Sequence, residues 1–248
     1  MREDLAARSL HFSSAAIQSR MDLRRPDALT LEYTRTMMAW TMLRPAARTL
    51  AMIGLGGGSI AKFCHRHMPQ ATLVVVEIDP RVIALREAFR VPADDARLRV
   101  VEDDGARFVA ATAERFDVLM VDAFDADGLP PPLGTQRFYD DCLDVLTSDG
   151  LLVVNLHAGD AQLGTYVERI ARSVGGAVLR VDDRDGTNSV VFAARGGGVR
   201  WRSGGGALRR PANLSEAGWK ELRGAFSRVT NALAAQGASD DRVSDEPA

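Results

Sequence analysis

The sequence predicts an α/β protein built on a doubly wound, mostly parallel sheet, and three observations carry that prediction. From Thr49 onward, short apolar runs alternate with segments of helical periodicity, the pattern of parallel strands joined by helices. The first run ends in a turn with glycine at four of five positions, namely Gly54, Gly56, Gly57 and Gly58. Acidic residues directly follow the second, third and fourth runs, where the carboxyl ends of parallel strands would meet.

The composition excludes several classes of protein. The 248 residues, 46% of them apolar, are enough for a buried core, and a net charge of -2 gives no support for a nucleic-acid partner. No apolar stretch is long enough for a membrane span and no apolar leader follows Met1, so we expect a cytoplasmic protein. Cys64 and Cys142 have no neighbouring cysteine, so the sequence indicates neither a disulfide framework nor a metal site.

Residues 1–48 are expected to form a short N-terminal extension of strands or irregular chain followed by a helix. The segments at Leu10 and Ala15 have strand character, and a turn signal follows them. Apolar residues then recur at helical spacing over 31–43. We expect the Met and Trp side chains of this helix to pack in the core.

Residues 49–195 are expected to form the nucleoside-binding α/β domain. The expected strands are 49–53, 72–77, 98–101, 116–121, 151–155, 177–181 and 189–193. Helices are expected over 59–68, 106–113 and 161–174, with two more beginning at Asp79-Pro80, an N-cap followed by a first-turn proline, and at Thr135.

The C-terminal region is expected to lie outside that domain. Residues 196–213 are rich in Gly and Arg and predict a connecting loop, because a single aromatic residue and no repeat argue against a nucleic-acid-binding segment. Residues 214–236 predict an amphipathic helix, and residues 237–248 predict a polar, disordered tail.

The glycine turn and the acid after the second strand predict a nucleoside site. Glycines remove side chains where the backbone turns sharply and a nucleoside approaches, although dinucleotide, nucleotide and S-adenosylmethionine binders share such turns and some are purely structural. Glu77 lies 21 positions after Gly56, where its carboxylate could accept hydrogen bonds from both ribose hydroxyls; the alternative is a solvated acid. A ring of acids favours a cationic sulfonium nucleoside and disfavours a pyrophosphate.

Two further pairs of acids are candidates. Asp103 and Asp104 could accept hydrogen bonds from the exocyclic amine of a base, or one of them could cap the helix that follows, and the two roles are compatible. Asp122 and Asp125 share one loop and could hold and deprotonate a cationic amine, because an acidic, partly desolvated setting raises the pKa of a carboxylate. The alternative is a turn stabilised by Asp side chains.

Histidines and other catalytic motifs give weaker signals. His157 follows the fifth strand and could line the pocket, whereas His65 and His67 are expected to be packing or surface residues. The sequence has no Gly-x-Ser-x-Gly motif, no Walker lysine after the glycines and no metal-ligand cluster, which argues against hydrolase, P-loop and zinc sites.

Five segments together resemble the polyamine aminopropyltransferases, the spermidine synthase family and its relatives, over about residues 15–195. They are Ile53-Gly-Leu-Gly-Gly-Gly58, Val76-Glu-Ile-Asp-Pro80-Arg-Val-Ile83, Asp103-Asp-Gly105-Ala-Arg-Phe108, Phe116-Asp-Val-Leu-Met-Val-Asp122-Ala-Phe-Asp125, and Phe138-Tyr139 ahead of Leu146-Thr-Ser-Asp-Gly150.

The resemblance implies the seven-stranded fold of class I S-adenosylmethionine-dependent methyltransferases and a homodimer or higher homo-oligomer. It implies transfer of an aminopropyl group from decarboxylated S-adenosylmethionine to a di- or polyamine, without a metal. By position, Glu77 would bind the ribose and Asp104 the adenine amine, Asp122 would be the general base, and Asp125 would hold the amine.

Three departures from the family are visible, one of them an N-terminal region that is short for the family's β-rich N-terminal domain. The family's Asp-Ser-Ser-Asp-Pro loop is here Asp122-Ala-Phe-Asp125-Ala, and its Tyr-Gln-Glu segment survives only as Leu31-Glu-Tyr33. Two alternatives therefore stay open, an S-adenosylmethionine-dependent methyltransferase and a catalytically silent nucleoside-binding homologue that acts as an oligomeric scaffold.

Overall fold

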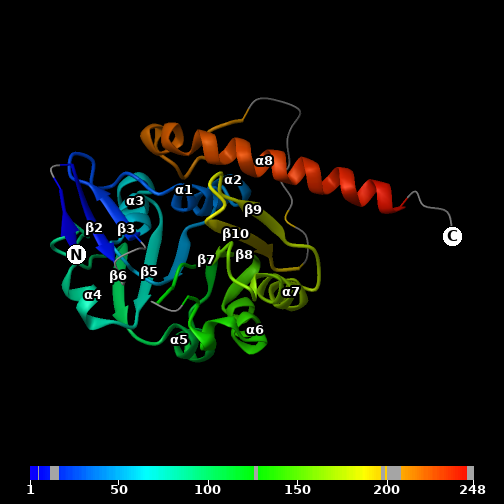
Figure 1. The fold of residues 1–248 in the computed structure, drawn as a ribbon, viewed down its shortest axis with the longest axis horizontal. Helices are drawn as coiled ribbons and strands as arrows, with labels where there is room; N and C mark the ends of the chain where they lie inside the picture. Colours follow the sequence, from blue (N-terminus) through cyan, green and yellow to red (C-terminus); the bar gives the residue numbers. More distant parts are fainter. Residues whose placement is uncertain (5, 12–16, 126–127, 197–198, 200–207, 245–248) are drawn as a thin grey trace.

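A seven-stranded sheet forms the centre of the molecule (Figure 1). The computed structural model describes residues 1–4, 6–11, 17–125, 128–196, 199 and 208–244. The strand order is β6-β5-β4-β7-β8-β10-β9; the first five strands are parallel, and β10 is antiparallel to both of its neighbours. The strands are β4 (Thr49–Ile53), β5 (Thr72–Glu77), β6 (Leu98–Glu102), β7 (Phe116–Val121), β8 (Leu146–His157), β9 (Leu179–Asp182) and β10 (Asn188–Ala194). The predicted fold class is confirmed.

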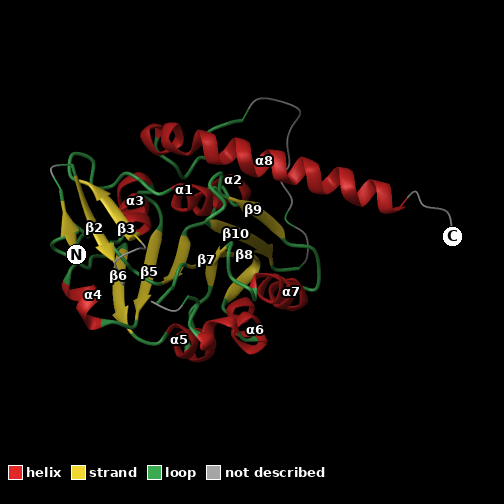
Figure 2. Ribbon diagram, viewed as in Figure 1, coloured by secondary structure: helices red, strands yellow, loops and turns green. Residues whose placement is uncertain are grey.

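Helices cover both faces of this sheet (Figure 2). Side chains alternate between the faces, so Leu50 and Met52 of β4 join one apolar cluster while Ala51 and Ile53 join the other. The helices between the strands are α3 (Ser59–His67), α4 (Pro80–Ala84), α5 (Gly105–Ala111), α6 (Gln136–Asp144) and α7 (Leu163–Val174), with a 3-10 turn, η1, at Pro131–Gly134. Parallel strands buried on both faces explain the nearly unbroken apolar runs in the sequence.

Side-chain caps start three of these helices at the positions that the sequence indicated. Asp79 accepts a hydrogen bond from the Arg81 amide and is followed by a proline, Asp104 caps α5, and Thr135 caps α6. Each cap satisfies an amide that would otherwise lack a partner in the first turn.

The N-terminal segment adds a small antiparallel sheet and two short helices. The sheet contains β1 (Arg2–Glu3), β2 (Ala7–His11) and β3 (Ile17–Asp22). The single helix expected over 31–43 is instead α1 (Glu32–Met38) followed by α2 (Trp40–Leu43). The helix is interrupted at Ala39, because its amide donates to the Thr36 carbonyl and its carbonyl accepts from the Met42 amide, the i to i+3 spacing of a 3-10 turn. The Met and Trp side chains of these helices are buried, as expected.

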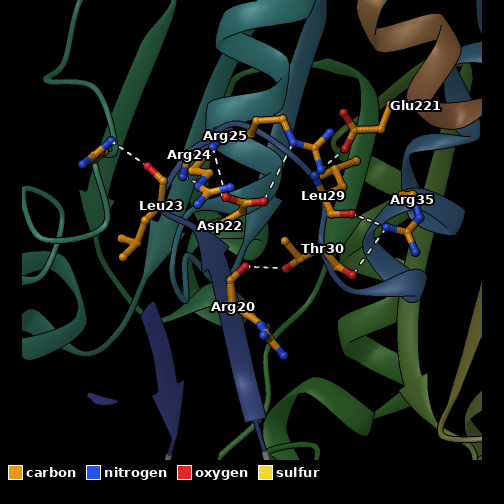
Figure 3. A network of polar contacts seen from close by, with 10 residues as sticks. Arg20, Asp22, Leu23, Arg24, Arg25, Leu29, Thr30, Arg35 and Glu221 are labelled. Atoms are coloured by element: carbon orange, nitrogen blue, oxygen red, sulfur yellow. Dashed lines mark hydrogen bonds and ion pairs between the residues drawn. The ribbon is translucent and has the colours of Figure 1, made fainter. Parts of the chain in front are cut away.

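Polar contacts fix the connection from β3 to α1 (Figure 3). The Thr30 hydroxyl donates to the Arg20 carbonyl at 2.6 Å, and Arg35 donates to the carbonyl oxygens of Leu29 and Thr30. The Leu29 amide in turn donates to Glu221 of the C-terminal helix at 2.5 Å. These bonds hold the start of α1, and with it Glu32 and Tyr33, over the end of the central sheet.

The C-terminal helix α8 (Glu216–Ser244) is longer than predicted. The sequence predicted a helix to 236 and a disordered tail from 237, but the helix continues to Ser244 and its end extends away from the body (Figure 1). Each further residue adds a backbone hydrogen bond, and no proline interrupts the chain before Pro247, so polarity alone does not end the helix. Residues 245–248 and most of the Gly/Arg-rich segment lie outside the described residues.

No helix in the described part of the chain combines the length and the apolar character needed to cross a bilayer.

Candidate active site

A cavity of about 1160 Å³ opens at the carboxyl ends of β4, β7 and β8, beneath α1 and the turn between β9 and β10. Six carboxylic acids line it: Glu32, Asp122, Asp125, Asp160, Asp183 and Asp185. The described residues that line it include no lysine or arginine. This excess of carboxylates creates a negative potential that attracts a cationic ligand.

Asp122 lines this cavity and directly follows β7. The pairing of Val121 with Val154 in the parallel sheet places Asn155 beside it, and the Asn155 side-chain amide donates to Oδ1 of Asp122 at 2.9 Å. The Tyr33 hydroxyl also hydrogen-bonds to this carboxylate. Burial raises the pKa of Asp122 to about 6, although both donors act in the opposite direction. Asp122 is thus an acid able to change protonation state near neutral pH.

Asp183 is a second buried acid in the same cavity, and the sequence did not single it out. Its side chain lies in the β9–β10 turn, and the residue is only 7% exposed. Burial, together with the nearby charges of Glu32 and Asp185, raises its pKa to about 6. Two carboxyl groups with raised pKa values therefore face one cavity.

Asp125 lines the cavity from the loop after β7. Its amide donates to the Gly128 carbonyl at 2.9 Å, which closes the loop, and its side chain is exposed. Phe124 adds an apolar wall beside it. Asp127, another acid that the sequence placed after this strand, lies outside the described residues.

The glycine turn contacts the site mainly through its backbone. Gly54 has φ +95°, and a Cβ there would lie 2.1 Å from the Asp122 carbonyl oxygen, so only glycine allows the turn to pack against the Asp122 backbone. Gly57 and Gly58 pack closely against Ser19 and Val91 instead. Gly56 is the one glycine of the four that lines the cavity.

Glu77 supports this turn from the end of β5. Its carboxylate accepts hydrogen bonds from the amides of Leu55 and Asp79, each at 2.9 Å, and the residue is only 8% exposed. A carboxylate has about four lone-pair positions, so two backbone bonds leave acceptor capacity for a ligand.

Asp103 and Asp104 are placed at the end of β6, and neither lines the cavity. Asp104 caps α5 by accepting from the Arg107 amide at 2.9 Å. Asp103 forms an ion pair with the Arg107 side chain and accepts from the Asp104 amide at 2.7 Å. Capping, one of the two compatible roles predicted from the sequence, is thus observed for Asp104.

The histidines have local roles in the structure. His157 lines the cavity but is exposed, and its Nδ1 accepts from the Gly159 amide at 3.2 Å. His67 is buried, with its two ring nitrogens 2.8 Å from Ser215 Oγ and 3.1 Å from Asp27, and His65 pairs with Asp95. Across the described residues, no group of three or more His, Cys, Asp or Glu side chains is arranged to hold a metal.

Sequence comparison decides the family. The Spermine/spermidine synthase domain matches residues 30–172, more than half of the chain. The chain belongs to the spermine/spermidine synthase family. A polyamine aminopropyltransferase from Neisseria meningitidis is 35% identical over 188 residues, which cover 75% of this chain and 72% of the relative. One from Chromobacterium violaceum is 36% identical over 189 residues, covering 76% and 72%. These relatives are named as transferases.

Solved structures agree with this family assignment at the level of the fold. A probable spermidine synthase from Corynebacterium glutamicum superposes with a TM-score of 0.64 at 20% identity, covering 73% of this chain and 70% of that one. Human methyltransferase-like protein 13 in complex with SAH gives 0.61 at 22% identity, covering 80% and 92%. The chain thus has the fold that is common to spermidine synthases and methyltransferases, as predicted.

The cavity residues of this spermine/spermidine synthase family member that were not assigned from the sequence include Tyr33, Asn155 and Asp183. Tyr33 could have been found from the sequence, because it lies in the Leu31-Glu-Tyr33 segment that corresponds to the family's Tyr-Gln-Glu segment. Asn155 lies within β8, two residues before its end, and its position beside Asp122 depends on strand register. Asp183 lies in a polar turn whose sequence is typical of an exposed turn. Its burial results from tertiary packing and is therefore not visible in the sequence.

Proposed function

We propose that this protein transfers an aminopropyl group from decarboxylated S-adenosylmethionine to a di- or polyamine. The observation that carries the proposal is Asp122, held between Tyr33 and Asn155 in a cavity lined by six carboxylates. Membership of the spermine/spermidine synthase family supports the same activity.

In this proposal Asp122 is the general base. An ammonium cannot attack until it loses a proton, and a carboxylate whose pKa is raised to about 6 accepts that proton more readily than an ordinary aspartate. The freed amine lone pair forms a bond to the methylene carbon of the aminopropyl group that is attached to the sulfonium. The carbon–sulfur bond breaks with its electron pair going to sulfur, and methylthioadenosine leaves.

The remaining carboxylates would hold charge rather than move protons. Asp125 would anchor an amine at the cavity wall, with Phe124 restricting the space beside it. The co-substrate carries a sulfonium and an ammonium but no carboxylate, so it suits a cavity that includes six acids and no described basic residue. The carboxylated nucleoside would bring an anion into this negative potential.

The nucleoside would lie toward β5 and β6. Glu77 has acceptor capacity left for the ribose hydroxyls, and Asp104 could accept from the adenine amine while it caps α5. Gly56 would allow the sugar to approach the backbone. Asp103 would contribute through its pair with Arg107 and its bond to the Asp104 amide.

Calorimetry with three nucleosides tests the proposal. We expect decarboxylated S-adenosylmethionine and methylthioadenosine to bind at least tenfold more tightly than S-adenosylmethionine, because only the last carries a carboxylate. Preference for the carboxylated form would instead indicate a methyltransferase. Absence of binding by all three would indicate a silent scaffold.

The association of chains and the cellular location stay predictions. A homodimer or larger homo-oligomer is expected from the family resemblance, and light scattering after size-exclusion chromatography would measure it. A cytoplasmic location is consistent with the lack of a membrane-spanning helix in the described residues.

A further inference from the structure

The acid in the turn between β9 and β10 has a buried oxygen without a partner. Asp183 is 7% exposed, and although the Thr36 side chain hydrogen-bonds to its carboxylate, its Oδ1 has no partner among the described residues. Its backbone is well fixed, since its amide donates to the Asn188 carbonyl at 2.8 Å and its carbonyl accepts from the Gly186 amide at 3.1 Å. A buried polar atom without a partner is costly, so such an atom in a binding cavity indicates a ligand that supplies the donor.

Nearby arginines neutralise the negative charge around Asp183 only in part. Arg228 is a partly buried cation near Asp183, but its guanidinium is also 3.1 Å from Glu32 Oε1 and donates to the Thr36 hydroxyl at 2.7 Å. Arg184 is highly exposed and lies 3.7 Å from the same Glu32 oxygen. Two acids therefore share one partly buried arginine, and the cavity wall keeps a net negative charge.

The backbone of Asp183 is connected to the Asp122 side chain through Asn188 and Asn155. Asn188, whose carbonyl binds the Asp183 amide, donates from its side chain to Asn155 at 3.0 Å, and Asn155 donates to Asp122 at 2.9 Å. Tyr33 lies within the field of both acids, because the charges of Asp122 and Asp183 both raise its pKa. The two acids thus line one cavity, and both lie near Tyr33.

We propose that Asp183 is the anchor for the distal ammonium of the acceptor and makes the enzyme selective for linear amines with two or more amino groups. This inference rests on the proposed function. One nitrogen loses its proton to Asp122 and attacks, while the second stays protonated and donates to Asp183 Oδ1. A monoamine of the same chain length leaves Asp183 without a partner and gains nothing from it.

Steady-state kinetics with matched acceptors test this role, using 1,4-diaminobutane and n-butylamine with decarboxylated S-adenosylmethionine. In Asp183→Asn we expect the KM for the diamine to rise about 10- to 100-fold with kcat changed less than about threefold, because a charge-assisted hydrogen bond is lost only in binding. The kinetics with n-butylamine should not change. Asp183→Glu should restore part of the diamine preference.

Asp182→Asn is the matched control, since this neighbouring acid is exposed, pairs with Arg180 and does not line the cavity. It should keep the wild-type kinetics. If the wild-type protein transfers aminopropyl groups but Asp183→Asn keeps the same diamine-to-monoamine preference, the role of Asp183 is wrong and the proposed function stands. If the wild-type protein transfers nothing to any amine, the proposed function itself fails.

Calorimetry gives a readout that does not depend on turnover. In the presence of methylthioadenosine, the diamine should bind to Asp122→Asn and lose at least tenfold in affinity in the Asp122→Asn/Asp183→Asn double variant. Equal diamine affinity in the two proteins would overturn the anchor role.

Discussion

Acidic residues lie at the strand ends in both halves of the sheet, but the two halves differ in how far the protein satisfies those carboxylates with hydrogen bonds. At the ends of β5 and β6, the acids already have protein partners: Glu77 accepts two backbone amides, and Asp104 caps α5. On the side of β7 to β10, Asp122 has two side-chain donors but a raised pKa, and one oxygen of Asp183 has no partner.

The sequence predicts a single ring of acids around the glycine turn. The difference in hydrogen-bond partners divides that ring into two groups of carboxylates. Carboxylates bound to backbone amides are held rigidly and shape the turn against which a nucleoside would bind. Carboxylates that are buried with too few donors keep unused capacity for protons or cations. We therefore propose that the first half positions the nucleoside and that the second half carries the amine chemistry, and four experiments test that division.

The largest effect is expected from Asp122→Asn. The amide cannot accept the proton of the attacking ammonium, so kcat should fall about 10³-fold. Affinity for methylthioadenosine should stay within about twofold, because its binding belongs to the other half of the sheet. Stopped assays of product formation and calorimetry measure the two quantities, and substantial turnover in this variant would exclude Asp122 as the base.

A smaller effect on affinity is expected from Glu77→Gln. One oxygen becomes an amide group facing a backbone N–H, so methylthioadenosine affinity should fall about 10- to 100-fold and the free energy of unfolding should fall by about 2 kcal/mol. Glu102→Gln is the control, because Glu102 pairs with Glu77 in the sheet register but is exposed. Lost stability with unchanged nucleoside affinity would leave Glu77 with a purely structural role.

The pH dependence of kcat/KM should report the pKa of Asp122. A base must be deprotonated, so activity should rise with pH through about 6. In Tyr33→Phe the carboxylate loses a donor that favours its charged form, and the rise should move upward by about one pH unit. Tyr139→Phe, in the core away from this cavity, should leave the profile unchanged. A profile that does not move in Tyr33→Phe would separate Tyr33 from the base.

The smallest effects are expected in stability, with opposite signs in the two halves. The native pKa of Asp122 is raised to about 6 from 3.8, so its stabilising contribution is complete below about pH 4 and is lost as pH rises through 6. Asp122→Asn should therefore raise the free energy of unfolding by about 1 kcal/mol at pH 8 and have little effect at pH 4. Asp104→Ala removes a helix cap and should lower it by about 1 kcal/mol at pH 8.

Urea unfolding at the two pH values measures both variants. Destabilisation of the protein by Asp122→Asn at pH 8 would show that its hydrogen bonds from Asn155 and Tyr33 outweigh the cost of burying its charge.

Local patterns were enough to predict the central sheet. The apolar runs from Thr49 to Val121 coincide with strands, and Asp79-Pro80 and Thr135 mark helix starts through short-range capping. The same patterns did not predict the turn at Ala39 or the full length of α8, because tertiary packing and the continuation of a helix leave no strong mark in the sequence.

The sequence by itself determined which strand ends carry acids and where the glycine turn begins, because both depend on neighbours along the chain. Only the tertiary structure decided which of those acids are already satisfied. Asn155 reaches Asp122 through strand register, Tyr33 arrives from the N-terminal helix, and Asp183 is buried by elements distant in sequence. Hydrogen-bond partners and desolvation are properties of the packed chain, and they set the pKa of each carboxylate and its capacity for a ligand.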